Sequence, residues 1–183
     1  MITNLIKVQE FMLNKNICLL GNSNSILKHP KNIDSYDIIC RINRGSPIGR
    51  EKYIGSRTDI LFLATRMEEN IINSIFKPKY VIWTTKDVRL QSKWIKEHAI
   101  QNPPEDWQEL KDTLATLPST GCVAINFLVK YIAFNKLTLV GFDFFKSGTF
   151  YHHARQTWHD GANEEQYIRY LIRNESNITL LEE

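Results

Sequence analysis

Three of the five histidines in this sequence, His152, His153 and His159, fall within one short polar segment. Histidine transfers protons near neutral pH, so the cluster indicates general acid–base chemistry, with a metal site as the rival interpretation. The segment contains neither an HExxH pattern nor a cysteine of the kind that zinc sites use, which argues against a metal. Asp160 followed by Glu164 is also typical of an ordinary helix start, although that explanation does not account for the histidines.

A second polar segment, residues 21–25 (GNSNS), directly follows a short apolar run. It occupies the position of a dinucleotide-binding glycine fingerprint, but it has a single glycine, which argues against NAD or FAD. Asn22 and Ser23 can still donate hydrogen bonds to a phosphate, or they can simply form a turn and cap a helix. If the apolar runs before Asn22 and Asn43 are neighbouring strands, we expect these two asparagines to lie close together.

A third candidate is the segment Pro118-Ser119-Thr120-Gly121, at the start of a long apolar helix pattern. Unpaired backbone N–H groups, two hydroxyls and the positive end of the helix dipole make such a helix start a ready anion site. Plain helix capping by Ser119 or Thr120 explains the same residues equally well.

These segments interrupt a chain in which short apolar runs alternate with helical patterns. We expect strands at 17–20, 37–42, 60–64, 80–84, 136–141 and 178–181. We expect helices at 68–76, 94–100, 105–114, 121–134 and 161–173, and a long loop at 142–160. Strands that are apolar on both faces and alternate with helices predict an α/β fold, a mostly parallel sheet with helices on both faces. Ligands bind such sheets beyond the carboxyl ends of the strands, where all of the polar segments fall.

The composition is that of an ordinary soluble globular protein. The 183 residues are 43% hydrophobic and 23% charged, and their number favours a single domain over 1–183. No apolar run reaches about 18 residues, and the first residues lack the pattern of a signal peptide. The net charge of +3 comes from scattered Lys and Arg, which argues against nucleic-acid binding and suits an anionic substrate or a weak contact with an anionic membrane. Three cysteines at unrelated spacings indicate buried, reduced thiols in a cytoplasmic protein.

In their order along the chain, these segments resemble the sialylmotifs of glycosyltransferase family 29, the animal-type sialyltransferases. Residues 17–60, which include ICLLGNSNSIL and YDIICRINRGSPIGREKYIGSRTDI, resemble the large motif. LPSTGCVAINFLVKYIAFNKLTLVGFD resembles the small motif, YHH at 151–153 the third and HDGANE at 159–164 the very small one. The resemblance implies a single Rossmann-like catalytic domain. It also implies transfer of an acidic sugar, sialic acid, from a CMP-activated donor to a glycan acceptor, with inversion and without a metal or other cofactor.

Residue by residue, the resemblance implies a binding site for the donor. Asn22, Ser23 and Asn43 would contact the phosphate and ribose of CMP. Residues 119–121 would hold the cytidine end and the carboxylate of the acidic sugar, and Tyr151 would lie against the nucleotide.

The resemblance further implies two catalytic histidines. His153 would bind the departing phosphate, and His159 would be the general base that takes the proton of the acceptor hydroxyl. Glu164 is implied to orient its helix rather than to react. The residue types agree with this chemistry, because phosphate departure needs only charge stabilisation and the acceptor needs a base opposite the leaving group.

The sequence departs from that family in several places. Members of that family generally have a membrane anchor, a stem and a longer catalytic domain, none of which we expect here. The cysteine pair that joins the large and small motifs is absent, Asp143 replaces a glycine, and only residues 154–158 separate the last two motifs. We therefore expect a bacterial, cytoplasmic enzyme, able to contact the inner membrane peripherally, whose acceptor is a saccharide or a lipid-linked glycan. Three alternatives remain open: transfer of Kdo from CMP-Kdo, a non-catalytic CMP-binding module, and a metal-dependent hydrolase built on the histidine cluster.

Overall fold

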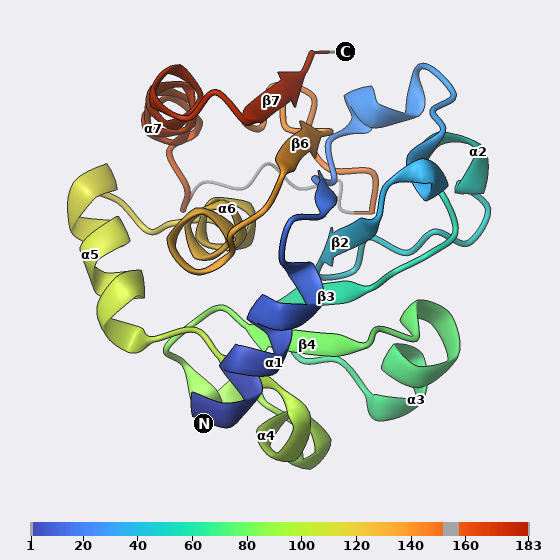
Figure 1. The fold of residues 1–183 in the computed structure, drawn as a ribbon, viewed down its shortest axis with the longest axis vertical. Coiled ribbons are helices and arrows are strands. Elements are labelled where there is room, and N and C mark those ends of the chain that lie inside the picture. Colours follow the sequence, from blue (N-terminus) through green and yellow to red (C-terminus); the bar gives the residue numbers. More distant parts are fainter. Residues whose placement is uncertain (1, 152–157, 183) are drawn as a thin grey trace.

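Seven parallel strands form one sheet through the centre of the molecule, within the residues that the computed structural model describes, 2–151 and 158–182 (Figure 1). The strands are β1 (Asn16–Leu20), β2 (Ile38–Ile42), β3 (Ile60–Leu63), β4 (Tyr80–Trp83), β5 (Ile100–Gln101), β6 (Lys136–Val140) and β7 (Ile178–Leu181). Their order across the sheet is β5-β4-β3-β2-β1-β6-β7. The chain therefore changes direction across the sheet between β1 and β6, and open α/β sheets bind ligands at such a switch point.

Helices cover both faces of the sheet (Figure 1). On one face lie α1 (Ile2–Met12), α6 (Thr120–Tyr131) and α7 (Gly161–Asn174), and α5 (Pro104–Leu114) packs beside α6. The other face carries α2 (Glu51–Ile54), α3 (Glu69–Ile71), which continues as the π-helix Ile72–Phe76, and α4 (Lys93–His98). The side chains of β1 alternate between the two faces: Ile17 and Leu19 join one hydrophobic cluster, and Cys18 and Leu20 join the opposite one.

The predicted fold class is confirmed, and each predicted strand lies within one residue of its expected bounds. Two α-helices and one strand have no counterpart in the prediction: the N-terminal helix α1, the short helix α2 and the two-residue strand β5. The predicted helix at 94–100 ends at His98, because Ile100 pairs with Ile82 of β4. The predicted helix at 121–134 ends at Tyr131.

Two glycines allow the ends of β1 and β6 to approach closely. A Cβ atom on Gly21, the residue after β1, would lie 2.2 Å from the carbonyl oxygen of Gly141, the residue after β6. Gly141 has a φ of +74°, a conformation that side-chain-bearing residues rarely adopt. The single glycine of the GNSNS segment is thus required by backbone packing against β6.

A buried arginine on β2 ties the sheet to the loop before β3. Arg41 is 1% exposed, and its guanidinium donates to the carbonyl oxygens of Ile54, Gly55 and Arg57 and to the hydroxyl of Thr58. Burial lowers the pKa of Arg41 to about 10, so the side chain stays charged at neutral pH. Its charge is held by oxygen atoms of the protein, as a buried cation requires.

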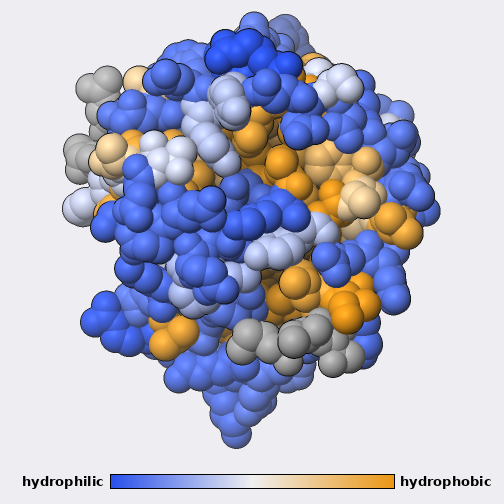
Figure 2. Space-filling view, turned by 60° about the vertical axis from the view of Figure 1, so that its left-hand side comes forward, coloured by the Kyte–Doolittle hydropathy of each residue, from blue (hydrophilic) through white to orange (hydrophobic). Residues whose placement is uncertain are grey.

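The surface is mostly hydrophilic on the side shown in Figure 2, and hydrophobic side chains gather in hollows between raised polar segments. Among residues 2–151 and 158–182, no helix has both the length and the apolar character needed to cross a bilayer. All three cysteines are free and buried.

Candidate functional site

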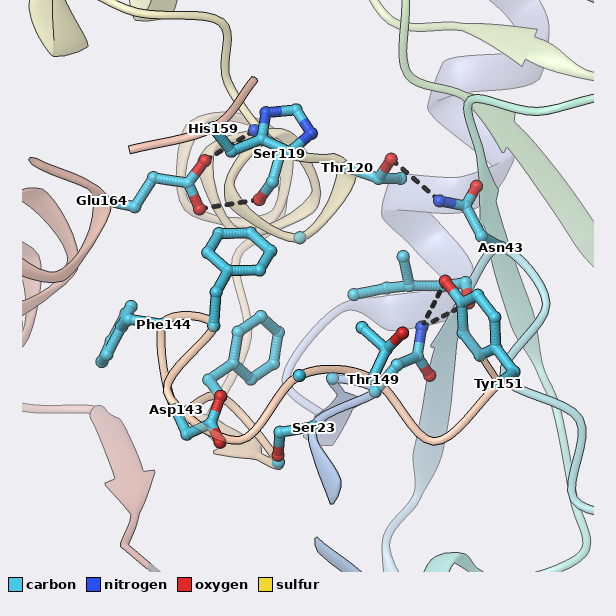
Figure 3. A pocket seen from close by; sticks show the side chains of 18 residues that line it. Ser23, Asn43, Ser119, Thr120, Asp143, Phe144, Thr149, Tyr151, His159 and Glu164 are labelled. Carbon is cyan, nitrogen blue, oxygen red and sulfur yellow. Dashed lines mark hydrogen bonds between the residues drawn. The ribbon is translucent and has the colours of Figure 1, made fainter. Parts of the chain in front are cut away.

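A pocket of about 150 Å³ opens at the carboxyl ends of β1, β2 and β6, beside the first turn of α6 (Figure 3). Eight of the nine predicted site residues line it: Asn22, Ser23, Asn43, Ser119, Thr120, Gly121, Tyr151 and His159. The ninth, His153, lies outside the described residues. The fold therefore brings into one cavity residues that are far apart in the sequence.

Asn22 connects three parts of the pocket wall. Its Nδ2 donates to the carbonyl oxygen of Ile42 at 2.9 Å and lies 3.5 Å from the hydroxyl of Tyr151. Its Oδ1 faces Gly45, where a Cβ atom would come within 2.2 Å. β1 and β2 are neighbouring strands, and Asn22 and Asn43, which were expected to lie close together on that condition, line the same pocket. Burial raises the pKa of the Tyr151 hydroxyl, which therefore stays protonated at neutral pH.

Asn43 joins the end of β2 to α6 and to the end of β3. It has a φ of +49°, a left-handed conformation that asparagine tolerates better than most residues. Its Nδ2 donates to Thr120 Oγ1 at 3.0 Å, and its Oδ1 accepts from the N–H of Ala64 at 2.9 Å. Both ends of the amide are thus bound by the protein, which fixes the side chain at the pocket wall.

Glu164 holds Ser119, the residue that begins α6. Its carboxylate accepts hydrogen bonds from the N–H of Ser119 at 2.6 Å and from the Ser119 hydroxyl at 2.7 Å (Figure 3). Glu164 is 3% exposed, and burial raises its pKa, although the bonds from Ser119 and the nearby His159 oppose that rise. The resemblance implied only that Glu164 orients its own helix, whereas here it also fixes the start of α6.

The first turn of α6 leaves two backbone donors for a ligand. Ser119 Oγ caps the N–H of Cys122, and the Ser119 carbonyl accepts from Val123. The N–H groups of Thr120 and Gly121 come earlier in the helix, where no intrahelical acceptor exists. Because the hydroxyl of Ser119 is occupied by Glu164 and by capping, these two N–H groups are the backbone donors that can hold an anion at this corner.

The imidazole of His159 is held in one tautomer. Its Nδ1 lies 2.8 Å from the carbonyl oxygen of Leu117, and because a carbonyl oxygen can only accept, Nδ1 carries the hydrogen. The Nε2 of the neutral ring therefore has a free lone pair. His159 also stacks on the ring of Phe145, with centroids 5.8 Å apart and 17° between the planes. A half-exposed imidazole with this tautomer can accept a proton from a molecule in the pocket.

Sequence reasoning missed the turn after β6, which it treated as a loop. Asp143, Phe144 and Phe145 all line the pocket. Phe144 and Phe145 have φ values of +56° and +66°, and a Cβ atom on Gly161 would lie 2.3 Å from the carbonyl oxygen of Phe144. Two adjacent left-handed phenylalanines carry no recognisable sequence signal, because their conformation depends on packing against α7.

The same loop is fastened to the segment after β1. Asp143 accepts from the N–H of Ser147 at 2.9 Å and from its hydroxyl. The Ser147 carbonyl accepts from Asn24 Nδ2, and its Oγ accepts from the N–H of Ser25. The two loops that follow β1 and β6 therefore form one connected rim.

The histidine cluster also raised the possibility of a metal site. In the part of the chain that the structure describes, no group of three or more His, Cys, Asp and Glu side chains is arranged to hold a metal ion. His152 and His153 lie outside that part.

Comparison with known proteins identifies the fold through structure rather than sequence. No protein-family model and no curated protein sequence matches the chain. A mammalian sialyltransferase solved in complex with Gal-beta-1-3GalNAc-ortho-nitrophenol is similar to it, with a TM-score of 0.61 and 17% identity over 99% of this chain and 79% of that one. The sialyltransferase CstII from Campylobacter jejuni, in complex with the substrate analogue CMP-3FNeuAc, has a TM-score of 0.63 and 12% identity over 91% of this chain and 81% of its own.

A further structure of CstII, in complex with a trisaccharide acceptor and CMP, has a TM-score of 0.61 and 13% identity, over 91% of this chain and 81% of that one. The chain therefore has the α/β fold that these sialyltransferases share. At such identities the likeness defines the fold, and function has to be argued from the site.

Proposed function

We propose that the protein is an inverting, metal-independent glycosyltransferase of the family 29 type, which transfers sialic acid from CMP-sialic acid to a glycan hydroxyl. The observation that carries the proposal is His159, whose hydrogen is fixed on Nδ1 by Leu117 while its ring lines the same pocket as the start of α6. A proton acceptor and an anion site in one cavity are what transfer from a sugar phosphate requires.

The donor would lie across the pocket. The amides of Asn22 and Asn43 and the hydroxyl of Ser23 would contact the phosphate and ribose of CMP, with Tyr151 against the nucleotide. The start of α6, residues 119–121, would hold the cytidine end and the carboxylate of the sugar, through the N–H groups of Thr120 and Gly121. Because the pocket side chains are already held by hydrogen bonds, binding would need little reorganisation.

The reaction would be a single displacement. The Nε2 of His159 takes the proton of the acceptor hydroxyl as its oxygen bonds to the anomeric carbon, and the bond from that carbon to the phosphate oxygen breaks. The charge on the departing CMP is stabilised by the amides, the helix start and His153. Attack on the face opposite the phosphate inverts the anomeric carbon.

Calorimetric titration with CMP tests the donor site directly. CMP is expected to bind with an affinity that UMP and AMP do not match and that EDTA does not change. Absence of CMP binding would overturn the proposal, and binding that vanishes with EDTA would overturn it in favour of a metal site. Turnover of CMP-sialic acid compared with CMP-Kdo then decides which sugar is transferred.

We also propose that the enzyme acts in the cytoplasm of a bacterium. Three free, buried cysteines support a reducing compartment, because thiols persist there without forming disulfides.

A further inference from the structure

A second cavity, of about 360 Å³, lies next to the pocket on the side of β2 and β3. Its floor is formed by Met67, Ile71, Ile75 and Phe76, from the β3–α3 loop and the helix that follows. The successive residues Asn43 and Arg44 line the two cavities, Asn43 the pocket and Arg44 this second one. We call it the arginine-flanked cavity, after Arg44 and Arg66 on its rim.

The floor of the arginine-flanked cavity is apolar and open to a ligand. Met67 and Phe76 are nearly buried, at 5% and 4% exposed, and belong to the hydrophobic cluster beneath β3 and β4. Ile71 is 38% exposed at the mouth. The backbone of Ile72–Phe76 forms a π-helix, a widened turn that is frequently found at functional sites.

The rim carries one uncompensated positive charge among the described residues. Arg66 forms an ion pair with Glu68 at 3.3 Å, so these two charges largely cancel. Arg44 is exposed, and its guanidinium has no hydrogen bond or ion pair with the described part of the chain. It is close enough to Tyr151 to lower the pKa of that hydroxyl, against the larger effect of burial. Arg44 therefore stands between the pocket and the apolar floor.

A third cavity on the opposite side of the pocket lacks these features. It shares Phe142, Asp143 and Phe144 with the pocket, but its three basic and three acidic side chains sum to no net charge. Glu165 forms ion pairs with Lys146 and with Arg169, at 2.8 and 2.9 Å. A ligand with an anionic and an apolar part is matched by the arginine-flanked cavity and not by this one.

We propose that the arginine-flanked cavity binds the aglycone of the acceptor, an alkyl chain joined to the saccharide through a phosphate. The alkyl chain would lie on the floor around Ile71 and Ile75, and the phosphate would accept hydrogen bonds from Arg44. This inference rests on the proposed function, since CMP and its sugar would fill the pocket and leave the remote part of the acceptor to a neighbouring cavity. The acceptor would accordingly be a lipid-linked phosphosaccharide.

Three matched probes test the proposal: galactose, octyl galactoside and galactose 1-(octyl phosphate). Their binding to the whole chain is measured by calorimetry with saturating CMP and again without it. The octyl phosphate probe is expected to bind about tenfold more tightly than octyl galactoside, the gain typical of a hydrogen bond to a charged group. Arg44→Gln should abolish that difference, and Ile71→Ser should weaken both octyl probes and leave galactose unchanged.

Arg173→Gln is the matched control, because it removes the same charge from an exposed arginine on α7. Equal affinities of the two octyl probes, or equal losses in Arg44→Gln and Arg173→Gln, would overturn the inference while CMP binding stands. Failure of the proposed function would show instead as absent CMP binding. If CMP does not bind, the arginine-flanked cavity is still supported when Arg44→Gln weakens the binding of galactose 1-(octyl phosphate) and Arg173→Gln does not.

Discussion

The phenyl ring of Phe145 lies almost parallel to the imidazole of His159, with the ring centroids 5.8 Å apart. Phe145 and its neighbour Phe144 both adopt left-handed backbone conformations, which cost about 1–3 kcal/mol each and persist only where surrounding contacts hold them. Gly161, directly after the Asp160 cap of α7, leaves the space in which this turn fits. The strained turn thus places the ring of Phe145 against the imidazole of His159.

Replacement of His159 by Ala should remove turnover and leave CMP affinity nearly intact. A general base contributes about 10² to 10⁴ in rate, so release of CMP from CMP-sialic acid should fall by that factor. The measurement pairs initial rates with calorimetric CMP binding. A variant as active as the wild type would indicate a different base, and an inactive wild type that binds CMP would indicate a binding module.

Phe145→Leu should lower kcat without changing KM for the donor. A stacked aromatic pair contributes about 0.5–1.5 kcal/mol, so the expected loss in kcat is about two- to tenfold. Phe145→Tyr keeps the aromatic face and should recover most of the rate. If the Leu and Tyr variants lose rate equally, or if KM rises instead, stacking on His159 is not what the side chain contributes.

Glu164→Ala should destabilise the fold, because it removes the acceptor for both donors of Ser119. A buried donor without a partner costs about 1–3 kcal/mol, so the loss of the acceptor for two donors should lower the free energy of unfolding by about 2–6 kcal/mol. Glu164→Gln retains an acceptor oxygen and should lose less. Urea unfolding gives both values, and equal losses in the two variants would contradict the role assigned to these bonds.

Asp34 should make stability depend on pH at the acid end. Partial burial raises its pKa, but hydrogen bonds donated by Ser56 and Arg57 outweigh that effect and hold the pKa below its usual value of 3.8. A folded-state pKa below the unfolded one adds stability above pH 3.8, and this is lost as the pH falls through the folded value. Asp34→Asn should therefore be less stable than wild type at pH 7, and the gap should narrow below pH 3.8. A gap that stays constant with pH would show that the carboxylate charge contributes nothing.

The sheet could be predicted from the sequence because strands apolar on both faces leave a strong local signal. Ile17-Cys18-Leu19-Leu20 is an example, since all four side chains are buried. β5 could not be predicted in this way, because two residues have no periodicity and Ile100 becomes a strand only by pairing with Ile82. The widening of the helix at Ile72 is likewise a consequence of packing, with no residue type that marks it.

The site was predictable where polar residues directly follow strands, as Asn22 and Asn43 do. The fold brought these segments together once the strand order was set. The partner of Ser119 is Glu164, 45 residues later, and its carboxylate reaches α6 only through the packing of α7. Phe145 escaped prediction because an aromatic residue in a loop is read as ordinary apolar surface.

Three buried thiols can report local opening of the structure: Cys18, Cys40 and Cys122. They lie on β1, β2 and α6, the elements whose ends line the pocket, and each is fully buried. Burial raises the pKa of Cys18 to about 12, so its thiol is neither ionised nor accessible to an alkylating reagent at neutral pH. Alkylation then requires a local or global opening of the structure. The labelling rate of each cysteine, with and without CMP, would measure how often β1, β2 and α6 open and whether CMP makes that opening rarer.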